Sequence, residues 1–271
     1  MILSSFLYQI IDGGKEKGYS QRESLEIAQK AGVKNVDINA QMFDSTPVEK
    51  VKALLDEFDM TMCVHSARYC DFSDEDAYNK SLEIMKNDLL NAKKGGSKYL
   101  MAVPLLKDEE LKPDGQKQRE YFFRIFRDLA DFGAEMGVCV TVESYSDTRV
   151  PYGKISDLKW LLDGIENLYF NLDTGNFTLA GEDALEGAKA FLHKTVNVHL
   201  KDVAQVENST LVRRGVCYDC VALGEGIVQN DKILDLLKDA EYKGYLTVEV
   251  SGPLFDRTMK SLEYINNYLK M

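Results

Sequence analysis

Several kinds of segment and residue are missing or scarce in this 271-residue sequence. No run of about 18 apolar residues is present that could form a membrane-spanning helix. Lys and Arg number 33 against 44 Asp and Glu, so the net charge is −11 and no basic excess exists for binding phosphates. The N-terminal segment MILSSFLYQIIDGG lacks the basic start and small-residue cleavage site of a signal peptide. We therefore expect a cytoplasmic protein that binds neither membranes nor nucleic acid.

Cysteine is also scarce. Five cysteines, an odd number spread over a long chain, suit reduced thiols better than a disulfide framework. Cys217 and Cys220 form a Cys-x-x-Cys pair, but no second pair with zinc-site spacing accompanies them, and they do not open a helix after a strand. We expect neither a structural zinc site nor a redox centre at this pair.

Short β-branched or aromatic runs recur along the chain, and an amphipathic stretch follows each of them. The runs are too short for helices, and most are apolar on both faces, as in buried parallel strands. The eight predicted strands are Ile2–Leu7, Asn35–Asn39, Thr61–His65, Tyr99–Val103, Val138–Glu143, Leu168–Asp173, Val196–Leu200 and Leu246–Val250.

Residues typical of helix ends occur between these strands. Ser20 with Glu23, and Thr46 with Glu49 around Pro47, have the spacing of a capping box. Longer helices are predicted from Ser73 to Gly95–Gly96, from Pro113 to Gly137, and over Asp231–Ala240 and Phe255–Leu269.

The repeated strand–helix unit predicts the fold class. Helices between buried strands indicate right-handed crossovers and a parallel sheet, and eight such units are typical of a closed (β/α)8 TIM barrel. A doubly wound open sheet is the alternative. It is disfavoured because no Gly-x-Gly-x-x-Gly follows the first strand and no Gly-x-x-x-x-Gly-Lys-Ser/Thr loop occurs. No linker divides the chain, so we expect a single barrel domain over residues 1–271.

Four consecutive predicted strands carry an ionisable residue at their carboxyl ends, where barrel side chains point toward the active-site mouth. These residues are Glu143, Asp173, His199 and Glu249. Converging buried carboxylates repel one another unless a cation joins them. The alternative, that such residues are helix N-caps or solvated loop residues, stays open for Asp173 in its Asp-Thr-Gly sequence. Three carboxylates and one imidazole suit one divalent metal ion; we expect Mn²⁺, and Mg²⁺, Co²⁺ or Zn²⁺ also suit the set.

Short motifs around these positions resemble those of a known family. They are Val-Glu-Ser at 142–144, Asn-Leu-Asp-Thr-Gly-Asn at 171–176, Val-His-Leu-Lys-Asp at 198–202, Leu-Gly-Glu-Gly at 223–226 and Thr-Val-Glu-Val at 247–250. Together they resemble the xylose-isomerase-like barrels of the sugar-phosphate isomerase/epimerase superfamily. The resemblance covers the whole chain and is specific in its second half. It implies a metal held by Glu143, Asp173, His199 and Glu249 in an isomerase or epimerase of carbohydrate metabolism.

The predicted site suits proton transfer next to a carbonyl group. A metal that binds a carbonyl and a neighbouring hydroxyl lowers the cost of the enediolate that forms when the α-proton leaves. Glu143 and Glu249 are the candidate acid/base pair, one removing the proton and the other returning one. A sugar isomerase or epimerase is our main hypothesis. A lyase resembling inosose dehydratase is the alternative, because the enediolate can also expel a β-hydroxyl.

Six further residues are candidates for substrate contact: His65 at the end of the third strand, Asn176, Lys201 and Asp202 within the motifs, and Arg213 and Arg214 in the long segment before the last strand. The arginine pair can clamp a phosphate or carboxylate, although solvated loop arginines are equally common. For His65 a packed histidine is the equal alternative. Ketose 3-epimerases usually carry a histidine where this chain has Asn176 and an arginine where it has Gln205. A relative that acts on another polyol, a keto-acid or a cyclic keto-sugar is therefore at least as well supported as a ketohexose epimerase.

Two other functions are disfavoured. An enzyme resembling endonuclease IV holds three zinc ions and needs many histidines, whereas this chain has three. A non-catalytic carbohydrate-binding barrel does not need a complete acid/base pair. We expect a small carbohydrate as the partner. The 14 Tyr and 12 Phe could also supply the apolar contacts of a homo-oligomer.

Overall fold

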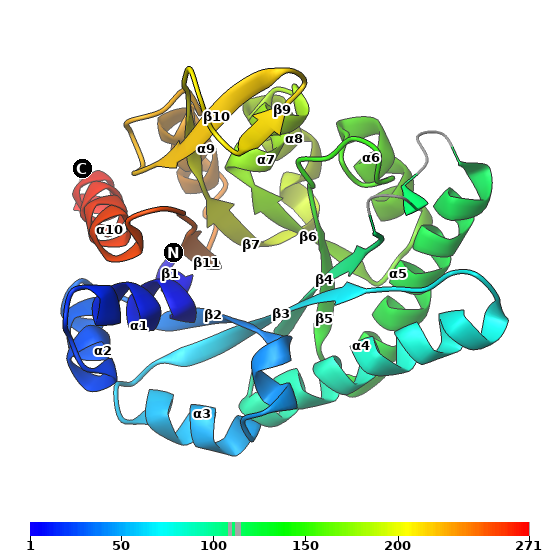
Figure 1. Cartoon of the computed structure of the whole chain (residues 1–271), viewed down its shortest axis with the longest axis horizontal. Helices are drawn as coiled ribbons and strands as arrows, with labels where there is room; N and C mark the ends of the chain where they lie inside the picture. Colours follow the sequence, from blue (N-terminus) through cyan, green and yellow to red (C-terminus); the bar gives the residue numbers. More distant parts are fainter. Residues whose placement is uncertain (108–109, 112–114, 271) are drawn as a thin grey trace.

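Eight parallel strands close into a barrel in the computed structural model, which describes residues 1–107, 110–111 and 115–270. Hydrogen-bonded neighbours follow the order β1-β11-β7-β6-β5-β4-β3-β2, and the last strand pairs with the first (Figure 1). The strands are β1 Ile2–Phe6, β2 Asn35–Asn39, β3 Thr61–Tyr69, β4 Tyr99–Leu105, β5 Cys139–Glu143, β6 Leu168–Asp173, β7 Thr195–Leu200 and β11 Tyr245–Val248. The predicted (β/α)8 barrel is confirmed.

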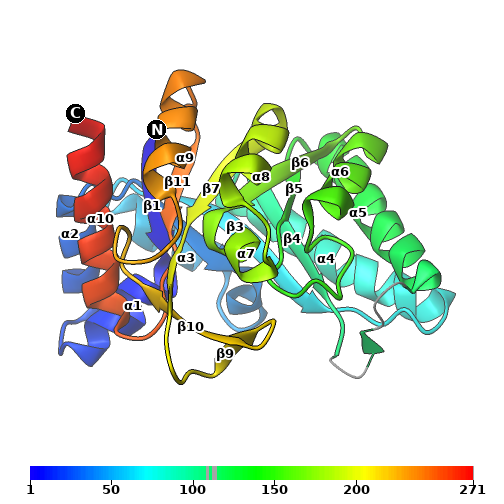
Figure 2. The ribbon, with the colours of Figure 1, turned by 90° about the horizontal axis from the view of Figure 1, so that it is seen from above.

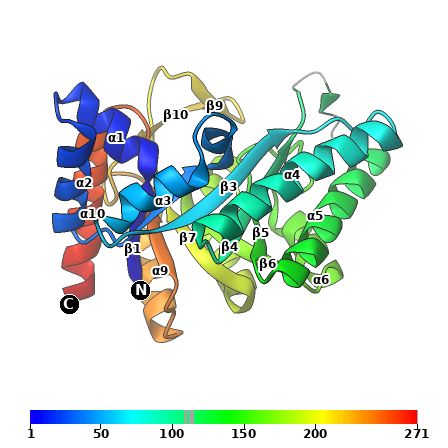
Figure 3. The same ribbon diagram turned by 90° about the horizontal axis from the view of Figure 1, so that it is seen from below.

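Helices surround the barrel on its outer side (Figures 1 and 3). The α-helices are α1 Leu7–Glu16, α2 Gln21–Lys30, α3 Val48–Asp56, α4 Glu75–Gly95, α5 Gln116–Met136, α6 Ile155–Gly164, α7 Thr174–Ala180, α8 Ala184–Phe191, α9 Asn230–Asp239 and α10 Leu254–Lys270. Short 3₁₀ segments include Ala40–Asp44 and Leu192–Lys194. Pro113, the predicted start of the helix that ends at Gly137, lies outside the described residues. Within the described part of the chain, no helix combines the length and apolar character needed to cross a bilayer.

One of the two predicted capping boxes is present. At the start of α2, the Ser20 hydroxyl accepts from the Glu23 amide at 3.2 Å, and the Glu23 carboxylate accepts from the Ser20 amide at 2.8 Å. The prediction for Thr46 is wrong. Pro47 occupies the N-cap position of α3 with extended backbone, and no side chain caps that helix.

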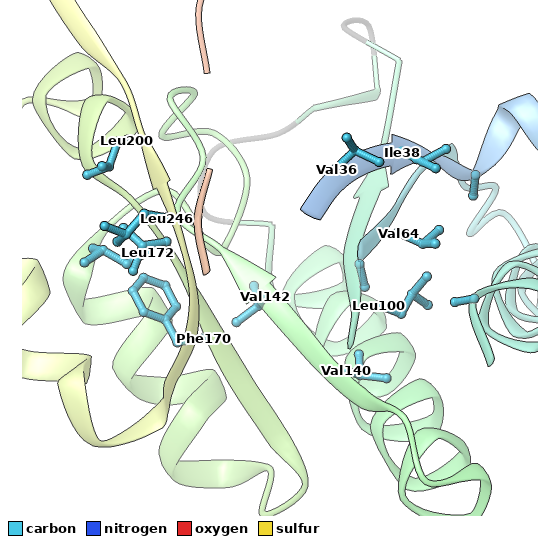
Figure 4. Close-up of a cluster of buried hydrophobic side chains, with 14 of the residues drawn as sticks. Val36, Ile38, Val64, Leu100, Val140, Val142, Phe170, Leu172, Leu200 and Leu246 are labelled. Carbon is cyan, nitrogen blue, oxygen red and sulfur yellow. The ribbon is translucent and has the colours of Figure 1, made fainter. Parts of the chain in front are cut away.

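Side chains alternate along the barrel strands between an apolar outer set and a polar interior set. Figure 4 shows the buried apolar set, whose labelled members are Val36, Ile38, Val64, Leu100, Val140, Val142, Phe170, Leu172, Leu200 and Leu246. On the other face, Thr247 of β11 donates to Asp37 of β2 at 2.6 Å, and Ser4 of the intervening β1 donates to the same carboxylate at 3.3 Å. The expectation that most strands are apolar on both faces is therefore wrong: their inner face carries hydrogen-bonding groups.

A small antiparallel sheet interrupts the strand–helix pattern between β7 and α9. Its strands are β8 Asp202–Gln205, β9 Leu211–Arg213 and β10 Val216–Val221, in the order β8-β10-β9. Cys217 and Cys220 both lie on β10, and all five cysteines are free thiols. Figures 2 and 3 place this sheet at the end of the barrel opposite both chain termini, which is the end where the barrel strands finish. That end carries the active site in TIM-barrel enzymes.

Candidate metal centre and active site

The barrel brings four ionisable side chains together at the carboxyl ends of β5, β6, β7 and β11. They are Glu143 and Asp173, which end β5 and β6, His199 within β7, and Glu249 immediately after β11. Strand register pairs Asp173 with His199, whereas Glu143 pairs with Asn171 and Glu249 follows Thr247, the partner of His199, by two residues. One potential ligand atom from each of the four residues lies within 4.8 Å of the others.

The His199 side chain points its Nδ1 atom between two carboxylates. Nδ1 lies 2.7 Å from Glu143 Oε1 and 3.4 Å from Glu249 Oε2. These are ion-pair distances, but the angles at Nδ1 satisfy no hydrogen bond to a residue that the structure describes. Buried polar atoms without a partner are rare in folded proteins. This atom, with carboxylate oxygens around it, has the chemistry of a mixed nitrogen and oxygen metal site, so the four residues fit one divalent cation.

Lys201 supplies a buried positive charge beside the same carboxylates. Its Nζ lies 2.9 Å from Asp173 Oδ2 and 2.6 Å from Glu249 Oε1, and it donates to Asn176 Oδ1 at 3.3 Å. The lysine stem passes directly over Gly175, where an added Cβ would lie 2.6 Å from the Lys201 Cγ atom. The glycine therefore leaves room for the lysine to reach the cluster.

The charges of this cluster balance when a divalent cation is included. Glu143, Asp173 and Glu249 together carry three negative charges, and Lys201 offsets only one of them. Buried charges are costly unless they are paired. A divalent cation beside a neutral His199 leaves the cluster neutral, and this balance agrees with the donor atoms in favouring a metal of charge two.

Proton affinities in the metal-free cluster reflect the same excess of carboxylates. Burial, together with repulsion from Glu249 and Glu143, raises the pKa of Asp173 to about 7, although Lys201 opposes this shift. Burial also tends to raise the pKa of Glu249, but Lys201 and His199 outweigh it and hold that pKa below its usual range. For His199, burial favours the neutral ring, yet the neighbouring carboxylates raise its pKa well above the usual value. A metal must therefore displace protons from the site when it binds.

Asn176 and Asp202, two of the expected substrate contacts, are engaged within the protein. The Asn176 backbone amide donates to Asp173 Oδ1 at 2.8 Å, so Asp173 also caps α7, as the alternative interpretation of the sequence allowed. The Asn176 side-chain amide donates to the Ser144 carbonyl at 2.8 Å. Asp202 accepts from the backbone amides of Val203, Gly224, Gly226 and Val228 at 2.9 to 3.1 Å. Asp202 therefore organises the Leu-Gly-Glu-Gly turn and does not pair with Lys201.

His65 lies in the barrel beside the cluster. Its ring packs edge-on against Phe6, with ring centroids 5.3 Å apart, and Phe6 packs in the same way against His199 at 5.1 Å. Burial, with repulsion from His199, lowers the pKa of His65 to about 3, so the ring is neutral at physiological pH. Its buried Nδ1 atom has no hydrogen-bond partner among the described residues. This leaves a polar atom for a ligand hydroxyl.

Several groups that support the cluster were not predicted from the sequence. His199 Nε2 faces Asn197 Nδ2 at 3.3 Å and Asp37 Oδ2 at 3.9 Å, and Asn171 Nδ2 donates to Glu143 Oε1 at 2.6 Å. Outer partners of this kind orient metal ligands. The signal was present in the sequence as polar residues with a period of two, Asn-Val-Asp-Ile-Asn in β2 and Asn-Val-His in β7.

Arg213 and Arg214 point to different places. Arg213 ends β9, and its Nε donates to Ser146 Oγ at 3.2 Å in the segment after β5. Arg214 has a positive φ of 54° in the following turn, and its guanidinium packs on Gly181, where an added Cβ would lie 1.7 Å from Nη1. The two arginines therefore do not form one clamp, and no ion pair joins either of them to the metal-ligand candidates in the described residues.

Comparisons with known proteins agree with the fold and the cluster. The family model "Xylose isomerase-like TIM barrel" matches residues 25–268. Curated relatives include inosose dehydratases of Clostridium perfringens (34% identity over 117 residues) and Bacillus thuringiensis (24% over 181). These alignments cover 37% and 61% of this chain and 38% and 59% of the relatives, so the chain matches less than two thirds of their length.

Solved structures are similar over nearly the whole chain. A D-allulose 3-epimerase from Methylomonas sp. superimposes with a TM-score of 0.78 at 16% identity, covering 99% of this chain and 98% of that one. The IOLI protein with a binding zinc atom gives 0.77 at 18% identity, covering 99% and 96%. At these identities the superpositions support the fold alone, whereas the family model spans most of the sequence. This chain belongs to the xylose isomerase-like TIM-barrel family.

Proposed function

We propose that this protein is a divalent-metal-dependent enzyme that removes the proton next to the ketone of a sugar or polyol derivative. The observation that carries the proposal is the placement of Glu143 and Glu249 on either side of His199 Nδ1, at 2.7 and 3.4 Å. A binding protein has no need of two carboxylates at that point. An enzyme that moves a proton from one face or carbon to another needs both.

Glu143, Asp173, His199 and Glu249 would hold the metal, and Mn²⁺ is the ion we expect from this donor set. When bound, the metal supplies electrophilic stabilisation of the negative charge that develops on the substrate carbonyl oxygen. A solved structure of similar fold, the IOLI protein, holds zinc. Metal identity is therefore part of the proposal to be tested.

Glu143 and Glu249 are proposed as the acid/base pair. They reach the site from β5 and β11, which are separated in the barrel by β6 and β7, so their carboxylates approach a bound substrate from different directions. One carboxylate accepts the α-proton, and the other delivers a proton to the opposite face or to the adjacent carbon. Delivery to the same carbon gives an epimer, and delivery to the adjacent carbon gives an isomer.

Lys201 and His65 have supporting roles in this proposal. Lys201 holds the outer oxygens of Asp173 and Glu249, at 2.9 and 2.6 Å, and so orients both carboxylates. His65 is neutral and has a free buried Nδ1 atom, which suits a hydrogen bond to a substrate hydroxyl. Asn176 and Asp202 act through the protein, by positioning Asp173 and the turn after β10.

Dehydration is the second candidate outcome. The curated relatives from Clostridium perfringens and Bacillus thuringiensis are inosose dehydratases, and this likeness favours a lyase acting on a cyclic keto-polyol. Both outcomes share the first step, removal of the α-proton. They differ in whether the substrate then regains a proton at carbon or loses a β-hydroxyl as water.

The test is an NMR screen of ketoses, keto-acids and inososes in heavy water, with protein loaded with Mn²⁺ or Mg²⁺ and with chelated protein. Deuterium entering the carbon next to the ketone, only in the loaded protein, supports the proposal. An epimeric or isomeric product then identifies an isomerase, and an unsaturated product identifies a dehydratase. Absence of both deuterium exchange and an unsaturated product across the panel, in protein of verified metal content, contradicts the proposal and favours a binder.

A further inference from the structure

We propose that a cavity above the metal-ligand cluster binds an anionic group at the far end of the substrate, with Arg213 as its cation. The proposal rests on the function proposed above and deepens it, because it assigns the substrate class: a keto-polyol that carries a carboxylate or phosphate. The cavity has a volume of about 410 Å³, and its walls include Tyr69, Leu105, Tyr145 and Arg213.

The position of the cavity follows from strand register. Tyr69 lies four residues beyond His65 on β3, and the two side chains share one face of the strand because strand side chains repeat every second residue. Tyr69 pairs with Leu105 of β4, just as His65 pairs with Met101 two layers below. Four residues of strand rise about 13 Å. The cavity therefore lies one to two side-chain layers further out from the barrel than the metal-ligand candidates.

Tyr145 connects the cavity with the cluster. It follows Glu143 by two residues and lines the cavity together with Arg213. A substrate that enters past Tyr145 has its reacting end at the cluster and its other end beside Arg213.

The charges that line the cavity favour an anion. Asp147 and Arg149 face it as well, but they bind each other, with Arg149 Nη2 2.5 Å from Asp147 Oδ2 and two further contacts of 3.0 Å. Arg213 makes no ion pair with a described carboxylate, although its charge acts with that of Arg149 in lowering the pKa of Asp147. Its Nε donates to Ser146 and its Nη1 to the Val212 carbonyl at 2.9 Å, so the guanidinium is held in place while Nη2 has no partner in the described part of the chain.

A cation held in this way is suited to ligand recognition. Its orientation is fixed before binding by two hydrogen bonds, which reduces the entropy lost on binding. Guanidinium groups bind carboxylates and phosphates through charge-assisted hydrogen bonds. Arg214 provides the matched contrast, since it is the next residue, carries the same charge and packs on Gly181 away from this cavity.

The experiment measures binding of three probes to metal-loaded protein by calorimetry: fructose, fructuronate and fructose 6-phosphate. They share the ketose end and differ in the group at the far end, which is neutral, a carboxylate or a phosphate. Wild-type protein should bind at least one anionic probe tenfold or more tightly than fructose, and Arg213→Gln should remove that preference while changing fructose binding less than twofold. Arg213→Lys should keep part of the preference, and Arg214→Gln should keep all of it.

Three results overturn the inference: no preference for either anion in the wild-type protein, equal weakening of fructose and anions by Arg213→Gln, or the same loss in Arg214→Gln. Carboxylate and phosphate are distinguished by which probe shows the larger loss. Because the readout is binding, failure of the proposed chemistry leaves the anion preference measurable. Conversely, failure of the anion subsite leaves deuterium exchange into neutral substrates unaffected.

Discussion

Replacement of Lys201 by methionine should tighten metal binding and lower the thermal stability of the metal-free protein. The Lys201 ammonium binds the outer oxygens of Asp173 and Glu249, and it is buried. Two unit charges 4 Å apart interact by about 4 kcal/mol at an effective dielectric constant of about 20. The lysine therefore repels a divalent cation that shares its carboxylate partners. Even about one third of that interaction, about 1.4 kcal/mol, corresponds to tenfold in affinity.

The assay is a competition titration of Mn²⁺ against a chelator, with Lys201→Arg as the charge-conserving control. We expect Lys201→Met to lower the metal dissociation constant at least tenfold and Lys201→Arg to leave it within threefold of wild type. In the metal-free state Lys201→Met should also unfold at a lower temperature, because Asp173 and Glu249 lose their cation. A tenfold weaker affinity for Mn²⁺ in Lys201→Met would refute the reasoning, since it would mean that ligand orientation outweighs repulsion.

The remaining predictions concern the turn after β10 and the pH dependence of the site. Asp202→Ala removes the acceptor of four backbone amides and should lower the free energy of unfolding by about 3 kcal/mol in urea titrations; a loss below about 1 kcal/mol would contradict this role. Metal affinity should fall as pH drops below about 7, the pKa of Asp173 without metal, because binding must then release its proton. Calorimetry in buffers of different ionisation enthalpy measures the number of protons released when the metal binds. If no proton is released at pH 6, the raised pKa of Asp173 is contradicted. Since this pKa is higher in the folded protein than in the unfolded chain, the stability that Asp173 contributes to the metal-free protein is lost as pH rises through about 7.

The strands and their polar ends could be predicted from the sequence because both signals are local. β2 and β6 have the predicted bounds, and β3 extends four residues beyond its predicted end at His65. That extension passes Arg68, whose guanidinium binds Asp88 at 2.8 Å, a contact between residues 20 positions apart. Strand ends that depend on such tertiary contacts carry no local signal.

The polar interior of the barrel was missed for a different reason. Val36, Ile38 and similar residues mark β2 as a buried strand, and the intervening Asp37 appears as an interruption in an apolar run. Only the closed barrel places Asp37 near Thr247, 210 residues away, and near His199. Contacts between side chains on distant strands depend on closure of the barrel. The sequence pattern predicts that the barrel closes, but it does not identify which residues then meet.

The two arginines show how a pair in sequence can separate in space. Arg213 and Arg214 were expected to act together because they are adjacent. Arg213 ends β9, whereas Arg214 lies in the β9–β10 turn with a positive φ, so the strand does not continue into Arg214 and its side chain leaves in another direction. A short antiparallel hairpin at this place was not predicted, and it is the feature that separates Arg213 from Arg214.

The most direct test of the proposed chemistry is solvent deuterium exchange in Glu143→Gln and Glu249→Gln at verified metal content. Glu225→Gln is the matched control, because Glu225 lies in an exposed turn and pairs with Lys260 on the surface. We predict that exchange into the substrate identified by the screen falls at least 100-fold in each of the two site variants, with one metal ion still bound per chain, and is unchanged in the control. Exchange at the wild-type rate in either site variant would contradict the assignment of Glu143 and Glu249 as the acid/base pair.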